Sequence, residues 1–520
     1  MAQTFKKLLY LLTTKERKKF YLLVFMMLIM ALLDMIGVAS ILPFMAVLTN
    51  PTLIETNSVL KAMFQISNVF GVENSQDFLF ATGGFVLLLL IFSLSFKALT
   101  TYAQVRFVQM RQYSIGKRLV EGYLDQPYAW FLNRHSANLG KTILSEVQQV
   151  IGGGLSPFMN LIATSVVAIA IITLLVITDP KLAFLVGFVL SLAYGLIFYL
   201  TRRYLNQNGK ERLKNNQLRF TAVSEAFGAA KEVKVGGLEQ IYSKRFSEPS
   251  KIVARNLASA ASISQLPRFF LEAIAFGGIL LLILFMMGKS GSLNTVLPII
   301  SLYVFAGYRL MPAIQQIYSS FSQLIVVKPS LDELYNDLKN LKPTKLTDNQ
   351  EILPFYKKIT LKNIHYNYPN SLRTALKDIT IDIKAKTTIG LVGPTGSGKT
   401  TTVDIILGLL EPQKGSLEVD GKVINKKNSR SWQRSIGYVP QQIYLSDDTI
   451  AANIAFGVNP RNINHKRIET VSKIANLHNF VVEELSDKYE TKIGERGVRL
   501  SGGQRQRIGI ARALYHNPKV

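Results

Sequence analysis

The chain has 520 residues, of which 48% are hydrophobic and only 18% charged, and its mean hydropathy of +0.21 is unusual for a soluble protein. Because it contains no cysteine, disulfides, thiolate zinc sites and cysteine nucleophiles are excluded, and its five histidines lack metal-ligand spacing. The formal net charge of +26 could indicate nucleic-acid binding, but the basic residues cluster beside apolar stretches. This pattern favours a lipid bilayer as the partner, and not nucleic acid.

Six apolar stretches occupy the first 327 residues. They lie at 20–48, 78–96, within 150–178, and at 182–201, 269–288 and 293–327. Each contains enough apolar residues to cross a bilayer core of about 30 Å. Asp34 interrupts the first stretch and Pro43 bends or ends it. This stretch is too long for a cleavable signal peptide and lacks a small-residue cleavage site. The sequence therefore predicts an all-α transmembrane domain of six helices over residues 1–327.

Lysine and arginine crowd the N-terminus and the two long connections at 104–149 and 203–266, whereas the alternate connections carry few of them. The positive-inside rule places these basic segments, and with them the N-terminus, in the cytoplasm. Both connections lack apolar runs long enough to span the bilayer, so we expect helical extensions into the cytoplasm. After the sixth span, prolines among charged residues predict a linker at 328–357.

An external segment at 58–70 is too short to span the membrane. Its apolar residues fall close to one face of a helix, and these are Val59, Leu60, Met63, Phe64 and Phe70. Two interpretations are open. The helix lies at the outer membrane surface or against the transmembrane bundle, where apolar side chains meet a lipid tail, or it is a short loop helix packed on its own protein.

Three basic residues stand at or inside the predicted spans, where charges are costly and usually face a cavity or a partner. Lys97 ends the second span, Arg268 opens the fifth and Arg309 lies inside the sixth. We expect the three cations to line one inward-facing chamber that suits a phosphate-bearing substrate. For Lys97 and Arg268, the alternative is that each extends its charged end to the membrane interface.

A phosphate-binding loop of the form GxxxxGK[ST] begins at residue 393. An apolar run at 388–392 precedes it and another follows at 401–407, which predicts strand, turn and helix. Such a turn points backbone N–H groups and a helix N-terminus at one spot, while the lysine reaches the phosphates of ATP and the next hydroxyl ligates Mg²⁺. The predicted nucleotide-binding residues are Gly393, Pro394, Thr395, Gly396, Ser397, Gly398, Lys399, Thr400 and Thr401, with Thr400 as the Mg²⁺ ligand.

The sequence LSGGQ follows at residues 500–504. Together with the phosphate loop, it resembles the nucleotide-binding domain of ATP-binding-cassette (ABC) transporters over residues 358–520. The resemblance implies an α/β P-loop NTPase domain in which the signature contacts ATP held by the other subunit. The signature residues with this expected role are Ser501, Gly502, Gly503 and Gln504. A dimer follows, formed by two copies or with a related half-transporter.

The same resemblance assigns roles to single residues. Tyr368 stands where an aromatic residue stacks on adenine, although a surface tyrosine is the alternative. Gln441, the first glutamine after Val-Pro, matches the residue that contacts Mg²⁺ and couples to the membrane domain, and Gln442 is the alternative within the pair. Lys399 and Gln441 are therefore the catalytic candidates.

Resemblance to exporter-type members adds coupling helices near 127–134 and 225–236 that rest on the ATP-binding domains, and Glu495 matches a segment that touches these loops. In this family an apolar strand ending in Asp-Glu, which supplies the general base, should follow Val520, with a switch histidine farther on. We expect the natural protein to continue past Val520, because the ATP-binding domain is incomplete without them. A chain that ended there would hydrolyse little ATP.

The sequences around Lys97, Arg268 and Arg309 resemble those of the ABC flippases that move lipid-linked oligosaccharides in bacterial N-glycosylation, and of related polysaccharide-lipid exporters. The resemblance implies that these cations attract the pyrophosphate of a polyprenyl-linked glycan. Gln315 and Gln316 stand where the flippase has a further arginine.

The sequence thus predicts a multidomain, homodimeric half-transporter of the bacterial inner membrane, with ATP and Mg²⁺ as cofactors and the ABC domain in the cytoplasm. Its expected cargo is an amphiphilic, lipid-linked substrate that is flipped or exported. A multidrug, lipid A or peptide exporter of the same architecture is the alternative. A membrane-anchored kinase or regulatory ATPase would need neither LSGGQ nor six spans.

Overall fold

The computed structural model describes residues 2–68, 71–178, 180–290, 293–341, 351–369, 371, 373–494 and 497–520. Glu495 lies outside these described residues. The chain divides into two compact units. The first comprises Met1–Leu124 and His135–Lys342, and the second comprises Asp125–Arg134 and Pro343–Val520.

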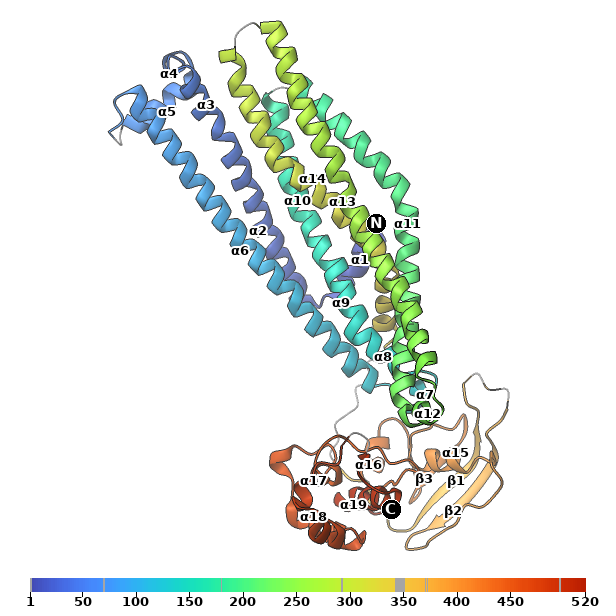
Figure 1. The fold of residues 1–520 in the computed structure, drawn as a ribbon. Coiled ribbons are helices and arrows are strands. Elements are labelled where there is room, and N and C mark those ends of the chain that lie inside the picture. The colour runs from blue at the N-terminus through green and yellow to red at the C-terminus, as the bar shows by residue number, and fades with distance from the viewer. Residues whose placement is uncertain are drawn as a thin grey trace. The chain divides into compact units, whose positions relative to one another are not determined.

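The first unit is a bundle of long helices (Figure 1). Its N-terminal half contains α1 (Ala2–Leu11), α2 (Thr14–Ala39), α3 (Ile41–Thr49), α4 (Leu53–Thr56), α5 (Ser58–Asn68) and α6 (Ser75–Leu124). The middle contains α8 (Ser136–Lys141), the π-helical turn η1 (Thr142–Glu146), α9 (Val147–Val150), a second π-helical turn η2 (Ile151–Leu155) and α10 (Ser156–Thr178). The remainder consists of α11 (Pro180–Gly228), α12 (Ala230–Val235), α13 (Glu239–Ser290) and α14 (Leu293–Asn340).

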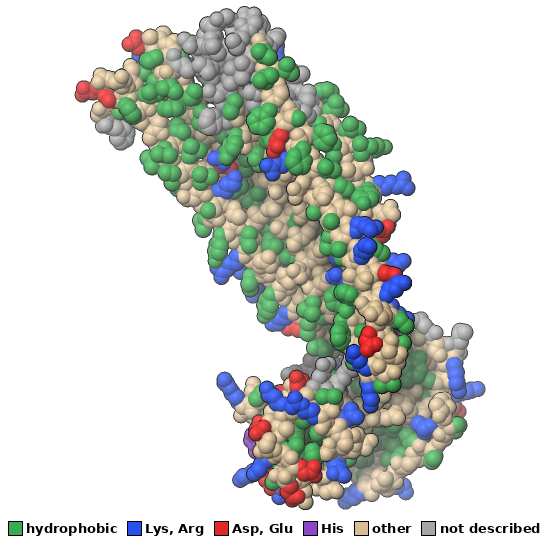
Figure 2. All heavy atoms as spheres, viewed as in Figure 1, with side chains coloured by type: hydrophobic (Ala, Val, Ile, Leu, Met, Phe, Trp, Pro, Cys, Tyr) green, Lys and Arg blue, Asp and Glu red, His purple; other side chains and the backbone are tan. Residues whose placement is uncertain are grey.

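The apolar stretches of the sequence all fall in these helices. Among the described residues, three helical segments are long and apolar enough to cross a membrane, and these are Thr14–Leu48, Ser75–Leu124 and Ser136–Thr178. The fourth, fifth and sixth predicted spans lie within α11, α13 and α14. Much of the visible face of the bundle carries hydrophobic side chains (Figure 2). Phe80 on α6 and Phe188 on α11 are 79% and 68% exposed, as expected of side chains that face lipid.

Two boundaries differ from the predictions. The first span is divided at Ser40, whose hydroxyl donates to the Gly37 carbonyl at 2.9 Å, and Pro43 lies inside the following helix α3. The linker predicted from residue 328 begins within a helix, because α14 continues to Asn340. Leu331 and Leu334 lie on one face of this extension and are fully buried, so packing keeps the segment helical despite its charges.

The external segment forms α5, which packs on its own protein. Leu60 is buried in a cluster with Val47 and Phe78, and the rings of Phe64 and Phe78 meet edge to face at 5.3 Å between centroids. Val47 lies on α3 and Phe78 on α6, so α5 packs against the helices of the bundle, an arrangement that both interpretations include. Val59, on the other side of α5, is 65% exposed.

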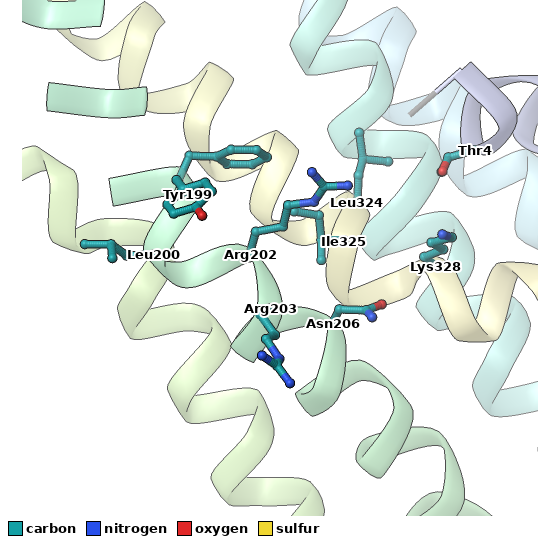
Figure 3. A pocket seen from close by; sticks show the side chains of 10 residues that line it. Thr4, Tyr199, Leu200, Arg202, Arg203, Asn206, Leu324, Ile325 and Lys328 are labelled. Atoms are coloured by element: carbon teal, nitrogen blue, oxygen red, sulfur yellow. The ribbon is translucent and has the colours of Figure 1, made fainter. Parts of the chain in front are cut away.

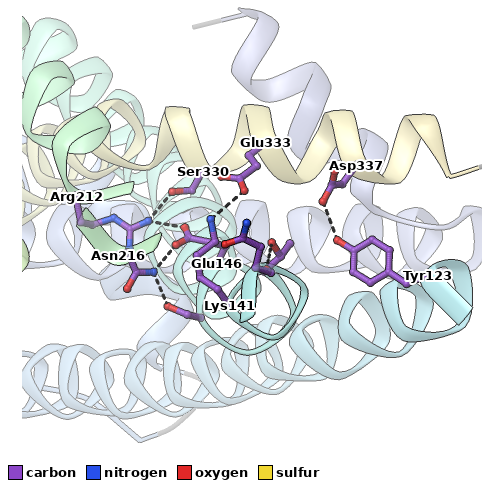
Figure 4. Close-up of polar contacts among 11 residues, drawn as sticks. Tyr123, Lys141, Glu146, Arg212, Asn216, Ser330, Glu333 and Asp337 are labelled. Atoms are coloured by element: carbon purple, nitrogen blue, oxygen red, sulfur yellow. Dashed lines mark hydrogen bonds and ion pairs between the residues drawn. The ribbon is translucent and has the colours of Figure 1, made fainter. Parts of the chain in front are cut away.

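A buried polar network ties η1 to α11 and α14 (Figure 4). The Arg212 guanidinium donates to the Glu146 carboxylate at 2.5 Å and to the Ser330 hydroxyl at 2.6 Å, and the Asn216 amide also donates to Glu146 at 2.5 Å. Glu146 is fully buried, so its carboxylate is satisfied by these partners and not by water. The network fixes which faces of the three helices meet.

The second unit contains α7 (Tyr128–Phe131) and the α/β part of the chain. Its strands are β1 (Lys358–Tyr366), β2 (Leu376–Lys384), β3 (Lys414–Val419) and β4 (Lys422–Val423). Its helices are α15 (Lys399–Ile406), α16 (Ser429–Gln433), α17 (Ile450–Ile454), η3 (Pro460–Asn462), α18 (His465–Ile474), η4 (Phe480–Glu484), η5 (Lys488–Glu490) and α19 (Gly502–Tyr515). Among the described residues the sheet has the order β2-β1-β3-β4 with antiparallel pairs, and Leu361 pairs with both Ile381 and Leu417.

Two hydrophobic clusters hold this unit together. One lies between the sheet and α15 around the fully buried Trp432, whose indole N–H donates to the Ile406 carbonyl at 2.7 Å and so anchors the end of α15. The other joins α17, α18 and α19 around Ile450, Val471 and Ile508. The phosphate loop thus rests on one cluster and the signature helix on the other.

The strand predicted at 388–392 is not formed. A strand exists only as one member of a hydrogen-bonded ladder, and no described residue pairs with this segment. The Val392 side chain is 96% exposed. The segment leads into the phosphate loop without regular secondary structure, while the helix predicted after the loop is present as α15.

Candidate functional site

The loop from Gly393 to Thr400 wraps around the N-terminus of α15. Gly398 precedes the helix with a φ of 90°, a left-handed conformation that favours glycine. A Cβ there would lie 2.6 Å from the Leu376 side chain and 2.8 Å from the Ala375 carbonyl oxygen, so no larger residue fits. The start of strand β2 therefore packs directly against Gly398 and restricts the conformation of the loop.

Lys399 closes the loop from inside. Its ammonium group donates to the carbonyls of Gly393 at 2.8 Å and Pro394 at 2.9 Å. A cation in the centre of the loop and a helix N-terminus at its base both favour a bound phosphate chain. The predicted loop residues are thus brought together by the fold, and Thr400, the predicted Mg²⁺ ligand, is exposed in the first turn of α15.

Tyr368 lies beside this loop. Its hydroxyl is 3.0 Å from the Thr401 hydroxyl, and its ring meets Tyr366 edge to face at 5.2 Å between centroids. The tyrosine is half-buried against the sheet cluster and is not an isolated surface residue. Arg373 was missed by the sequence reasoning, because it belongs to no motif. A guanidinium nitrogen of Arg373 lies 3.8 Å from the position that a Cβ of Gly396 would occupy.

The signature residues form the start of α19. Ser501 caps the helix, with the Gln504 backbone N–H donating to its hydroxyl at 3.2 Å and its own N–H donating to the Gln504 side chain at 2.7 Å. Ser501, Gly502 and Gly503 are exposed. No hydrogen bond or ion pair between described residues joins these four residues to the phosphate loop. Gln441 and Gln442 are both exposed after the Val-Pro pair, so exposure does not choose between them.

The short helix α7 belongs to the same compact unit as the phosphate loop. Ala129 packs against the sheet cluster. Burial, followed by the nearby Asp404, Tyr438 and Tyr368, raises the pKa of the Tyr128 hydroxyl. Burial likewise raises the pKa of the Asp404 carboxyl, which lies on α15 directly behind the phosphate loop. The helix expected at 127–134 therefore reaches the element that carries Lys399. The helix expected at 225–236 is present as α12, in the first unit.

The three cations of the predicted spans are paired with acids. The buried Asp34 carboxylate, whose side chain is 1% exposed, lies 3.0 Å from Arg309 and 3.7 Å from Lys97 and accepts a hydrogen bond from Ser93 at 2.8 Å. Arg268 instead pairs with Glu272 one turn along α13 at 2.8 Å. Arg268 therefore has a different acidic partner from Lys97 and Arg309, and the chamber lined by all three cations stays a prediction. One acid is shared by Arg309 and Lys97, so one positive charge remains in excess there.

A different group of cations lines a pocket of about 570 Å³ between α11, α14 and α1 (Figure 3). Arg202, Arg203 and Lys328 contribute to its walls together with Asn206, and no acid is among the described lining residues. None of the three cations makes an ion pair with a described residue. We call it the cationic pocket. From the sequence, Arg202 and Arg203 belonged only to a basic cytoplasmic stretch and Lys328 to the linker. The pocket appears when α11 and α14 pack together.

Comparison with known proteins yields two family matches. The family described as "ABC transporter transmembrane region" matches residues 39–312, and the family described as "ABC transporter" matches residues 376–520. The first match alone covers more than half of the chain.

Individual relatives agree with these matches. An "ATP-dependent lipid A-core flippase" of Ralstonia nicotianae is 28% identical over 407 residues, which is 78% of this chain and 68% of the relative. The "Heterocyst differentiation ATP-binding protein HepA" of Nostoc sp. is 28% identical over 449 residues, 83% of this chain and 71% of the relative.

A solved structure shows the same fold. It is described as a "bacterial Atm1-family ABC exporter with ATP bound" and superposes with a TM-score of 0.73 at 19% identity, covering 96% of this chain and 84% of that one. The described fold is thus that of an ABC exporter, in which a helical transmembrane domain is followed by an ATP-binding domain. The chain belongs to the ABC transporter family, as an exporter-type half-transporter and a membrane protein whose ATP hydrolysis is coupled to transport.

Proposed function

We propose that two copies of this chain form a transporter of the bacterial inner membrane that flips or exports an amphiphilic glycolipid with a phosphate-bearing head group. Polyprenyl-pyrophosphate-linked oligosaccharides and lipid A-core are the two candidate cargoes. The relatives named as lipid A-core flippases favour the second, and the contexts of Lys97, Arg268 and Arg309 favour the first.

The absence of a described hydrogen bond or ion pair between the phosphate loop and the signature residues 501–504 supports a dimer in which they meet across subunits. Lys399 and the N-terminus of α15 would hold the phosphates of ATP, Thr400 and Gln441 would hold Mg²⁺, and Tyr368 would stack on the adenine. ATP, when bound, supplies the phosphoryl group that water attacks. The exposed Ser501 and Gly503 of one subunit would contact the nucleotide bound to the phosphate loop of the other. In this arrangement α7, through Tyr128 and Asp404, would relay closure of the nucleotide site to the membrane helices.

The cationic pocket is the observation that carries the cargo assignment. Arg202, Arg203 and Lys328 converge on one pocket without an acid among its described lining residues. Guanidinium and ammonium groups are the side chains that bind phosphate. The pocket lies where the fourth and sixth predicted spans end, and a lipid phosphate would enter it there from the inner leaflet.

The test is cargo-stimulated ATP hydrolysis by the full-length protein in liposomes. Undecaprenyl-pyrophosphate-linked oligosaccharide or lipid A-core should stimulate hydrolysis. Replacing Arg202, Arg203 and Lys328 together by glutamine should raise the concentration for half-maximal stimulation by at least about tenfold.

The matched control removes three exposed lysines of α11 and α13, namely Lys210, Lys214 and Lys251. Their replacement by glutamine should leave the response to the glycolipid unchanged. Stimulation by a hydrophobic drug or a peptide, without any response to either glycolipid, would show that the protein is the multidrug or peptide exporter of the same architecture.

A further inference from the structure

A second cavity, of about 680 Å³, lies in the first unit between α13, α14 and the helical segment formed by α9 and η2. Its volume is in the range of small-molecule sites. Five glutamines line it, and we call it the amide cavity after Gln149, Gln265, Gln315, Gln316 and Gln323. On α14, residues 315, 319 and 322 recur at helical spacing, so a continuous polar stripe of this helix faces the cavity. Polar stripes within membrane helices mark substrate pathways.

Several polar groups of the amide cavity are without partners in the described part of the chain. Ser322 is 1% exposed, and its hydroxyl oxygen makes no hydrogen bond. The side chains of Gln149, Gln265 and Gln315 also have no hydrogen-bond partner among described residues. Gln323 donates from its amide nitrogen to the Ser319 hydroxyl at 3.1 Å and retains its amide oxygen as an acceptor. Buried polar groups in proteins are normally satisfied, so the buried Ser322 hydroxyl points to a polar ligand, and the half-buried Gln149 and Gln315 and the exposed Gln265 offer it further donors and acceptors.

The amide cavity differs from the cationic pocket in the charge of its lining residues. Its described lining contains one charged residue, Arg268, which is paired with Glu272 at 2.8 Å. The two cavities lie on different faces of the same part of α14, because Ser322 and Gln323 line one whereas Ile325 and Lys328 line the other. One face of α14 therefore suits phosphate, and the other suits an uncharged polar group.

We propose that the amide cavity binds the sugar portion of the cargo, an inference that rests on the proposed function. A sugar hydroxyl both donates and accepts hydrogen bonds, as do an amide side chain and a serine hydroxyl. The one charged residue of the described lining, Arg268, is already paired with Glu272, so the cavity favours an uncharged polar group over the charged ends of a peptide. Ala260, Ala261 and Pro312 provide apolar wall between the amides, against which the C–H face of a sugar ring packs.

The test compares lipids with and without sugar in the same liposome assay of ATP hydrolysis by the full-length protein. One pair is undecaprenyl-pyrophosphate-linked oligosaccharide and undecaprenyl pyrophosphate. The other pair is lipid A-core and lipid A without its core sugars. The variants are the double substitution Gln265→Leu/Gln315→Leu, and Ser322→Ala, which removes a single oxygen and so keeps the volume of the side chain. Gln148→Leu, at the exposed neighbour of Gln149, is the matched control.

The double variant should need about tenfold more sugar-bearing lipid for half-maximal stimulation, since two hydrogen bonds to sugar are lost. The sugar-free lipid of the same pair serves as the internal reference. The concentration of this lipid that gives half-maximal stimulation should rise much less. Ser322→Ala should likewise raise the half-maximal concentration of the sugar-bearing lipid relative to that of the sugar-free lipid. Gln148→Leu should leave this ratio of concentrations unchanged. An equal shift for both lipids of a pair, or no shift in either variant, overturns the sugar site. If neither pair stimulates the wild-type protein, the proposed function itself fails.

Discussion

Replacing Lys399 by alanine should reduce ATP hydrolysis by at least about a hundredfold, to the background of the assay. The ammonium group is the only lysine charge at the centre of the described phosphate loop, 2.8 Å from the Gly393 carbonyl, and phosphoryl transfer depends on such a charge to stabilise its transition state. The measurement is phosphate release from ATP by the full-length protein in liposomes, with and without glycolipid.

The control for this prediction is Lys422→Ala, at an exposed lysine of the short strand β4 in the same unit. It should hydrolyse ATP at the wild-type rate. The thermal unfolding temperature of Lys399→Ala without nucleotide should stay close to that of the wild type, because the lysine contacts only the loop. If Lys399→Ala kept most of the ATPase activity, this loop would not be part of the catalytic site.

Replacing Asp34 by alanine should destabilise the transmembrane domain by about 3–5 kcal/mol, the usual cost of breaking a buried ion pair from one side. The carboxylate is 3.0 Å from Arg309 and 3.7 Å from Lys97. Without it, the Arg309 guanidinium, which is only 18% exposed, stays in a membrane helix with no acid beside it. Thermal unfolding in detergent should show the loss as a lower midpoint.

A compensating variant makes this prediction specific. Asp34→Leu/Arg309→Met removes both buried charges and should recover much of the lost stability, because Lys97 is 46% exposed and can extend to the membrane surface. Asp77→Ala, at an exposed acid in the first turn of α6, is the control and should unfold like the wild type. Equal midpoints for Asp34→Ala and Asp77→Ala would mean that Asp34 does not neutralise Arg309.

The pairing of Asp34 also marks the limit of what the sequence predicts. Hydrophobic runs and positive charges locate the membrane helices, because span length and loop charge are local properties of the chain. The partners of a charge are not local. Asp34 and Arg309 are 275 positions apart, and from the sequence Asp34 was merely an interruption of the first span, whereas Arg309 was expected to line a chamber.

The nucleotide site was more predictable, because its chemistry is carried by contiguous motifs. The helix after the phosphate loop forms at the expected residues, whereas the capped helix α19 that begins at the signature was not predicted. The strand expected before the loop does not form, since a strand depends on a neighbour that the motif does not specify. Arg373 and the cationic pocket carry no motif, and they are found only when segments distant in the sequence are brought together.

The claim that two copies share each nucleotide site can be tested directly, because residues 1–520 contain no cysteine. Thr395 in the phosphate loop and Gly502 at the start of α19 are both exposed, and a Cβ at Gly502 meets no atom within 4 Å, so cysteine fits at each position. The full-length Thr395→Cys/Gly502→Cys protein is treated with a short thiol-reactive cross-linker, with and without Mg²⁺ and ATP, and its mass is read on a denaturing gel.

A mixture of two differently tagged chains, one with Thr395→Cys and the other with Gly502→Cys, shows which subunits are joined. A cross-linked dimer should form and increase with ATP, both in the double variant and between the two tagged chains. Neither single variant alone should give a dimer. A double variant that stays at monomer mass when ATP is bound would contradict a nucleotide site built by two subunits.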